Sequence, residues 1–296
     1  MGPTAAGKTP LAVELVSRFP CEIISVDSAM VYREMNIGTA KPDAETLKKA
    51  PHHLIDFLDP KEIYSAGKFR DDVLREINLI IARGKIPLLV GGTMMYFRIL
   101  QQGLAVLPKA DASVRAELEK CAEDQGWPSL HQELANVDSE AAKKINPNDS
   151  QRIQRALEVY ILSGRTISEW QKDTNSNTDY DFCNIALSPV DRKILHERIE
   201  KRFDAMLASG FIEEVEKLYA RGDLTPDLPS IRSVGYRQVW EYLSGLSTYE
   251  EMRDKAIAAT RQLAKRQITW LRSWPNVNWV DAEEEDVVEK VCEKII

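Results

Sequence analysis

The beginning of the chain carries the residues and the spacing of a phosphate-binding loop. Residues 2–9 read GPTAAGKT, which fits the pattern G-x-x-x-x-G-K-[ST]. In such a loop, backbone N–H groups at the start of a helix face phosphate oxygens, and the amine of Lys8 adds a positive charge. The hydroxyl of Thr9 is placed to ligate Mg²⁺. The pattern predicts a polyphosphate or pyrophosphate site, with a chance match in a turn as the alternative.

Two further polar side chains follow predicted strands. Residues 21–27, CEIISVD, predict a buried strand that ends in Asp27, and residues 86–93, IPLLVGGT, predict another that ends near Thr93. The carboxyl ends of parallel strands border the ligand crevice, so both side chains are expected to face Lys8. There Asp27 can accept a proton from an attacking nucleophile, and Thr93 can hydrogen-bond a ligand. The alternatives are an aspartate that caps the next turn and a tight Gly-Gly-Thr turn.

The second of these strands ends without a carboxylate. A nucleotide hydrolase places an acid at this point to position Mg²⁺ and water, whereas this chain has Gly91, Gly92 and Thr93. The sequence therefore offers no obvious second acid for hydrolysis.

Basic residues gather in a few segments of an acidic chain. Arg198 and Arg202 lie one turn apart on a predicted helix, 191–208, where an arginine can clamp a pyrophosphate or simply face solvent. Basic residues interleaved with aromatic ones suit contacts with RNA phosphates and stacked bases. Trp270 fits a place in the core better than a stacking platform. The segments with this pattern are QRIQR (151–155), PSIRSVGYRQ (229–238) and KRQITWLR (265–272).

The overall composition is that of a globular protein. With 296 residues, 44% of them hydrophobic and 29% charged, the chain can form one large domain or two smaller ones. It has no apolar run long enough to span a bilayer, no secretion signal and no C-x-x-C pair among its 4 cysteines, so we expect a cytoplasmic protein with reduced thiols. The formal net charge of −7 argues against a nucleic-acid partner on average but leaves room for a basic groove.

The order of the predicted elements indicates an α/β protein with a helical insertion. Short apolar runs alternate with amphipathic helices such as 68–84, which favours a parallel sheet. Between residues 106 and 180 only helices are predicted, and the polar run 172–181 predicts a linker. We expect a discontinuous core, 1–105 with 181–296, and an all-helical insertion at 106–180. Further predicted elements are a weak strand at 52–57, helices at 111–126, 149–164, 211–221 and 248–273, and strands at 182–187 and 276–280.

Taken together and in order, these motifs resemble the bacterial tRNA dimethylallyltransferase family. The likeness covers nearly the whole chain, whereas a general phosphate-loop kinase shares only the first motif. That family transfers a dimethylallyl group from dimethylallyl diphosphate to the exocyclic amine of the adenosine 3′ of the anticodon. The resemblance implies a P-loop NTPase-like parallel sheet flanked by helices, and a helical insertion that meets the anticodon stem-loop. The motifs are GPTAAGKT, SVDSAMVY, MNIGTAKP, PLLVGGTMMY, NDSQRIQRALEV, LPSIRSVGYRQ and ATRQLAKRQITWLR.

The resemblance also implies roles for individual residues. Lys8, Thr9 and Mg²⁺ would neutralise a pyrophosphate leaving group, and Arg202 would clamp it. Asp27 would accept the proton of the adenosine amine, and Thr93 would sit beside the reacting groups. The implied diphosphate ligands are Gly2, Pro3, Thr4, Ala5, Ala6, Gly7, Lys8, Thr9 and Arg202. The implied tRNA contacts are Asp27, Ser28, Ala29, Met30, Thr93, Arg115, Gln151, Arg152, Ile153, Gln154, Arg155, Arg232, Ser233, Val234, Gly235, Tyr236, Arg237, Lys265, Arg266, Gln267, Ile268, Thr269, Trp270, Leu271 and Arg272.

Two other functions stay open at this point. One is a small-molecule or nucleotide kinase that uses the same loop for ATP, and the other is a non-catalytic RNA-binding protein with a degenerate loop. The partners expected from the resemblance are tRNA and dimethylallyl diphosphate, without a membrane, and the chain is expected to act as a monomer.

The start of the chain raises a separate expectation. Family members carry several apolar residues before the loop, which form the central strand of the sheet, whereas here Met1 alone precedes it. We expect a shortened chain start. Extension by about five to eight apolar residues is expected to raise stability and strengthen pyrophosphate binding.

Overall fold

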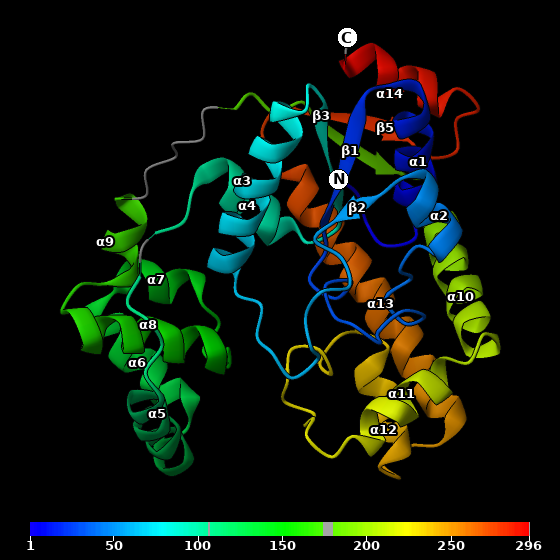
Figure 1. Ribbon diagram of the computed structural model, residues 1–296. Coiled ribbons are helices and arrows are strands. Elements are labelled where there is room, and N and C mark those ends of the chain that lie inside the picture. The colour runs from blue at the N-terminus through cyan, green and yellow to red at the C-terminus, as the bar shows by residue number, and fades with distance from the viewer. Residues whose placement is uncertain (106, 174–179, 296) are drawn as a thin grey trace. The chain divides into compact units, whose positions relative to one another are not determined.

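The computed structural model describes residues 1–105, 107–173 and 180–295, and the chain divides into two compact units (Figure 1). One unit is Met1–Arg98 with Tyr180–Ile296, and the other is Ile99–Asp179. The first boundary lies inside helix α4 (Met94–Gln102), earlier than the change of composition near residue 106 suggested. Most of the polar segment expected to be a linker, residues 174–179, lies outside the described residues.

A three-stranded parallel sheet positions the predicted strand ends of the first unit. Strand β1 (Cys21–Val26) lies between β2 (His52–His53) and β3 (Ile86–Gly91), and helix α3 (Ala66–Ala82) connects the outer two. Val26 pairs with Gly91, so the chain leaves β1 and β3 at the same edge of the sheet. The Thr93 N–H donates to the Val26 carbonyl at 3.2 Å, which holds the two strand ends together.

A second parallel pair lies in the same unit. Strands β4 (Asn184–Ser188) and β5 (Val277–Asp281) confirm the strand character predicted for both segments. Met1 bonds along β4, because its amino group donates to the Ile185 carbonyl at 2.7 Å and its carbonyl accepts from the Leu187 N–H at 2.9 Å. Side chains of α1 (Lys8–Arg18), β4, β5 and α14 (Val287–Ile295) form one hydrophobic cluster.

A group of helices completes the first unit. The helix predicted at 248–273 begins with a capping box, since the Thr248 hydroxyl accepts from the Glu251 N–H while the Glu251 carboxylate accepts from the Thr248 N–H. Long-range ion pairs of Arg253 with Glu200 and Asp204 connect two of the helices. The helices are α2 (Ala44–Lys49), α10 (Arg192–Ala208), α11 (Phe211–Ala220), α12 (Tyr236–Leu243) and α13 (Tyr249–Arg272).

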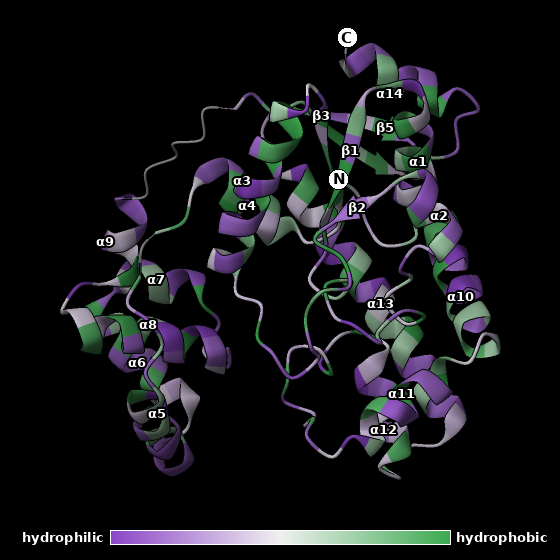
Figure 2. Cartoon of the chain, viewed as in Figure 1, coloured by the Kyte–Doolittle hydropathy of each residue, from purple (hydrophilic) through white to green (hydrophobic). Residues whose placement is uncertain are grey.

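The described residues of the second unit form helices and connecting segments, with no strand. Its hydrophobic core is formed by Leu118, Leu130, Leu134, Ile153 and Leu157, each on the inner side of an amphipathic helix. In Figure 2 the helices of both units alternate hydrophobic and hydrophilic residues, as this packing requires. The helices are α5 (Ala112–Gln125), α6 (Trp127–Val137), α7 (Ser139–Lys144), α8 (Ser150–Ser163) and α9 (Ile167–Lys172). No helix in the described part of the chain combines the length and apolar character needed to cross a bilayer.

Candidate active site

The predicted phosphate loop leads directly into helix α1. Gly7 has a φ of 85°, in the left-handed region that favours glycine, and it precedes the first helical residue, Lys8. No side chain caps this helix end within the described residues, and its first turn contains no acid. The N–H groups of the first turn therefore remain available to a ligand, and the helix dipole favours an anion there. Pro10 lies in this first turn, where its missing N–H costs nothing.

Two cations converge on the loop. The ammonium group of Lys8 donates to the Pro3 carbonyl at 2.7 Å, and the guanidinium of Arg202 on α10 donates to the Thr4 hydroxyl. Burial lowers the pKa of Lys8 to about 8, opposed by the charge of Asp27 and reinforced by that of Arg202. Burial also lowers the pKa of the Arg202 guanidinium, which Asp27 partly opposes. A bound anion would compensate this desolvated positive charge, so the loop is built for a strongly anionic group.

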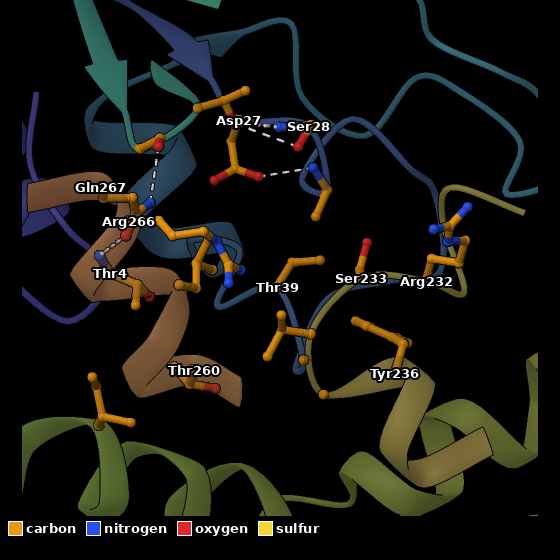
Figure 3. Close-up of a pocket in the computed structure, with 18 of the residues that line it drawn as sticks. Thr4, Asp27, Ser28, Thr39, Arg232, Ser233, Tyr236, Thr260, Arg266 and Gln267 are labelled. Carbon is orange, nitrogen blue, oxygen red and sulfur yellow. Dashed lines mark hydrogen bonds between the residues drawn. The ribbon is translucent and has the colours of Figure 1, made fainter. Parts of the chain in front are cut away.

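Asp27 performs the turn-capping role and still presents a carboxylate oxygen to the site. Its Oδ1 accepts from the N–H groups of Ala29, at 2.8 Å, and Met30, at 3.1 Å. The other oxygen accepts no hydrogen bond within the described part of the chain, and the side chain lines a cavity (Figure 3). Thr93 lies beside it, with its hydroxyl accepting from the Ser28 N–H at 3.1 Å. In this one conformation, Asp27 can therefore both cap the turn and accept a proton from a ligand.

The loop and the strand ends border two adjoining cavities of the first unit. The larger cavity, about 800 Å³, is lined by the phosphate loop and by the basic residues Arg198, Lys201 and Arg202. The smaller, about 500 Å³, contains Asp27 and Thr93. A ligand with an anionic head and an uncharged remainder can span both. The residues that line both cavities are Thr4, Asp27, Thr39, Gly92, Arg202, Leu263 and Gln267.

The smaller cavity has a polar part and an apolar part. Figure 3 places it between Thr4 and Gln267 on one side and Arg232 and Ser233 on the other. Its polar lining includes Ser28, Thr93, Arg232 and Ser233. Its apolar lining includes Ile199, Phe203, Met206, Phe211 and Leu263. This division suits a ligand pair in which one partner is a nucleobase and the other a small hydrocarbon.

Gln267 supports the phosphate loop, a role that its sequence segment does not reveal. Its side-chain oxygen accepts from the Thr4 N–H at 2.8 Å, and its amide donates to the Gly92 carbonyl at 2.8 Å. The residue is buried on α13. It thereby joins the loop to the end of β3, and both the oxygen and the nitrogen of its side-chain amide bond protein groups.

Gln267→Ala is expected to lower the free energy of unfolding by about 1–3 kcal/mol, because the half-buried Thr4 N–H and the buried Gly92 carbonyl lose their partner. Urea denaturation measures this change. Gln262→Ala is the matched control, since Gln262 is an exposed residue of the same helix. Equal stability of the two variants would contradict the supporting role.

The segment on α13 that was expected to contact tRNA has two faces. Lys265, Arg266, Thr269 and Arg272 are exposed, whereas Leu271 is fully buried. Trp270 and Ile268 are half-buried, and the ring of Trp270 lies 5.9 Å from the Arg98 guanidinium and lines the smaller cavity. The expectation for the whole segment is therefore corrected at Leu271, whose side chain belongs to the core.

The segment around α12 is divided in the same way. Arg232 and Arg237 are exposed, Ser233 and Val234 are half-buried, and Gly235 is buried. Tyr236 is fully buried and forms part of the cavity wall. Its hydroxyl donates to Glu214 at 2.5 Å. It is therefore positioned by the core and cannot reach a ligand outside the cavity.

Two candidate arginines of the helical unit pair with a buried carboxylate. Glu158 is completely buried and accepts from the guanidinium groups of Arg115 and Arg155. Arg155 also donates to the Pro108 carbonyl, and Gln154 donates to Glu119 and to the Arg115 carbonyl. Gln151 and Arg152 are exposed, whereas the side chain of Ile153 lies in the hydrophobic core. The expectation of tRNA contact is therefore corrected at Ile153.

The residues around the loop partly fit a bound Mg²⁺. Thr9 lines the larger cavity at the start of α1. The described residues contain no group of three or more histidine, cysteine or acidic side chains that could hold a metal. A magnesium ion commonly takes few protein ligands and several phosphate or water oxygens, which suits a single threonine hydroxyl beside a diphosphate.

A parallel sheet, a phosphate loop at a helix N-terminus and a carboxylate at the neighbouring strand end define a P-loop protein with a site for an anionic ligand. Residues 30–274 match the family described as IPP transferase, so the chain belongs to the IPP transferase family. This confirms the family resemblance stated from the motifs.

Solved structures show the same relationship. The chain is 38% identical to a full-length tRNA isopentenylpyrophosphate transferase from Bacillus halodurans, with a TM-score of 0.72 over 99% of this chain and 94% of that one. It is 34% identical to a tRNA delta(2)-isopentenylpyrophosphate transferase from Staphylococcus epidermidis, with a TM-score of 0.71 over 100% and 96%. A eukaryotic dimethylallyltransferase acting on tRNA is 26% identical, with a TM-score of 0.80 over 99% and 76%. These likenesses confirm the P-loop fold expected from the sequence.

Proposed function

We propose that the chain transfers a dimethylallyl group from dimethylallyl diphosphate to the exocyclic amine of the adenosine 3′ of a tRNA anticodon. The products are N6-isopentenyladenosine and diphosphate. The observation that carries the proposal is the junction of the cationic cavity at the phosphate loop with a mixed polar and apolar cavity at Asp27. Membership of the IPP transferase family and the likeness to transferases that act on tRNA support this choice of substrates.

The side chains at the junction suit a direct displacement. The amine nitrogen forms a bond to C1 of the dimethylallyl group while the C1–O bond breaks, and diphosphate leaves with the electron pair. Gly2–Thr9, Lys8 and Arg202 stabilise the charge of the leaving group. The second carboxylate oxygen of Asp27 takes the proton of the amine, and Thr93 sits beside the reacting groups. No water is activated, which agrees with the absence of an acid at the Gly91–Thr93 strand end.

A magnesium ion fits this scheme at Thr9. When bound, it would add positive charge beside the diphosphate oxygens and so assist departure of the leaving group. The Thr9 hydroxyl would be its protein ligand, with the remaining positions taken by phosphate and water.

The tRNA would approach the smaller cavity from the exposed faces of the basic segments. Lys265, Arg266 and Arg272 on α13 and Arg232 near α12 offer charge for phosphates. The adenosine would have to leave its stack to bring its amine to Asp27. The helical unit would hold the anticodon stem-loop, chiefly through Gln151 and Arg152. We propose that the chain acts as a monomer in the cytoplasm.

Incubation with dimethylallyl diphosphate, Mg²⁺ and unmodified tRNA is expected to raise the tRNA mass by one C₅H₈ unit. Nuclease digestion and mass spectrometry locate the addition on the adenosine 3′ of the anticodon. The matched control is a tRNA with guanosine at that position, which offers no exocyclic amine at C6. Phosphate transfer from ATP without prenylated tRNA would instead identify a kinase, and tRNA binding without either product would identify an RNA-binding protein.

A further inference from the structure

Three aromatic side chains close the apolar part of the smaller cavity, and we call them the aromatic wall: Phe203 of α10, Phe211 of α11 and Tyr236 of α12. Their rings meet edge to face, with centroids 6.1 Å apart for the two phenylalanines and 5.1 Å apart for Phe211 and Tyr236. Phe203 is 5% exposed, and the other two are 0% exposed. The wall is therefore a part of the core that borders the cavity.

Neighbouring protein groups hold the aromatic wall in place. The Tyr236 hydroxyl donates to Glu214, and the same carboxylate accepts from the N–H groups of Asn36 and Ile37 at 2.9 and 2.8 Å. The next residue, Gly38, packs so closely that a Cβ there would lie 2.1 Å from the Phe211 ring. Because a backbone segment and a half-buried carboxylate hold the rings, the wall cannot readily withdraw to enlarge the cavity.

The wall also stands next to the residue that would bind the leaving group. Ile199, Arg202 and Phe203 occupy neighbouring positions on α10, and all three line the smaller cavity. A hydrocarbon attached to a diphosphate held by Arg202 would therefore meet Ile199 and Phe203 first. The polar lining formed by Ser28, Thr93 and Ser233 remains for the adenosine.

We propose that the aromatic wall sets the length of the isoprenoid donor, admitting a five-carbon group and excluding a ten-carbon one. Burying further carbons in an apolar cavity normally favours binding, so an open cavity would prefer the longer donor. Exclusion requires a rigid obstacle, and one methylene too many can cost roughly 10- to 200-fold in a hydrophobic pocket. This inference rests on the proposed function and adds its donor specificity. The chemical step is unchanged, with the C–N bond formed, the C1–O bond broken and diphosphate released.

The test compares kcat/KM for geranyl diphosphate and dimethylallyl diphosphate with one tRNA. The parent is expected to prefer the five-carbon donor by about 100-fold or more. Phe203→Ala is expected to raise the geranyl-to-dimethylallyl ratio at least about tenfold and to yield tRNA carrying a C₁₀H₁₆ unit. Phe203→Leu keeps more of the core volume and is expected to raise the ratio less. Phe69→Ala is the matched control, because Phe69 is a buried ring of the same unit that lines neither cavity.

The outcomes separate the inference from the proposed function. If folded Phe203→Leu or Phe203→Ala keeps the parent's geranyl-to-dimethylallyl ratio of kcat/KM, the inference is wrong while the proposed function stands. The same conclusion follows if Phe69→Ala raises this ratio as much as the Phe203 variants do. Efficient use of geranyl diphosphate by the parent also overturns it. A parent that transfers neither donor overturns the proposed function and, with it, the inference.

Discussion

Replacing Asp27 by asparagine is expected to lower the rate constant of prenyl transfer by about 10²- to 10⁴-fold, because the variant loses the carboxylate that accepts the proton of the amine. Asparagine retains Oδ1, which accepts from the N–H groups of Ala29 and Met30, so the turn is expected to persist. Single-turnover kinetics with saturating donor and tRNA measure the chemical step, and filter binding shows whether tRNA affinity is kept.

Asp43→Asn provides the matched control for this substitution. Asp43 also uses its carboxylate to accept a backbone N–H, that of Thr46, at the start of α2, and it lines neither cavity. The Asp43→Asn variant is expected to transfer the prenyl group at the rate of the parent. An Asp27→Asn variant as active as this control would show that Asp27 caps a turn and takes no proton.

The phosphate loop and the strand ends were accessible to sequence reasoning because their geometry is local. The loop pattern predicts a helix at its end, and α1 does begin at Lys8, directly after Gly7. The two strand ends then follow from the parallel pairing of β1 and β3, which aligns Val26 with Gly91. Asp27 and Thr93 reach the same edge as a consequence of this register.

The supports of the site depend on contacts that no local pattern encodes. The side chain of Gln267 bonds the N–H of Thr4, 263 positions away, and Arg202 bonds the same residue from 198 positions away. The resemblance placed Gln267 in a tRNA-contacting segment, but the segment is a helix whose inner face turns this amide toward the loop. Which face is inward is decided by packing against the rest of the unit.

For the same reason, the basic residues in a sequence segment were a poor guide to which side chains can bind phosphates. The arginines of the helical unit looked like phosphate ligands, yet Arg115 and Arg155 both pair with Glu158, which is fully buried. An acid on the inner side of α8 requires such partners, because an isolated buried carboxylate is strongly disfavoured. The basic residues that remain exposed on α13 are defined only once the helix has packed.

The second large effect is expected at Lys8, whose positive charge is unfavourably buried in the phosphate loop. Lys8 is held with its pKa lowered to about 8 by burial, so the free protein maintains a partly desolvated ammonium group at neutral pH. Such a group is unfavourable until an anion arrives and becomes most favourable when charge develops on the leaving diphosphate. Its contribution is therefore expected in turnover more than in tRNA binding.

Lys8→Ala is expected to lower turnover by about 10²- to 10³-fold while leaving tRNA affinity nearly intact, as for the loss of one donor to a developing negative charge. Steady-state prenylation and filter binding of tRNA measure the two quantities. Lys193→Ala is the control, since Lys193 is an exposed residue of α10 that lines neither cavity. Equal turnover of Lys8→Ala and Lys193→Ala would refute the role of Lys8.

A pH series with inorganic pyrophosphate tests the same charge directly. Below pH 8 the Lys8 ammonium is present in the free protein, and above it the proton is lost, so the affinity advantage of the parent over Lys8→Ala is expected to shrink as pH rises through about 8. Taking the ratio of the two affinities removes the ionisation of pyrophosphate itself, because both proteins bind the same ligand. Lys8→Arg keeps its charge throughout this range, so its advantage over Lys8→Ala is expected to stay constant. A parent ratio that also stays constant would mean that the lowered pKa of Lys8 has no part in holding the diphosphate.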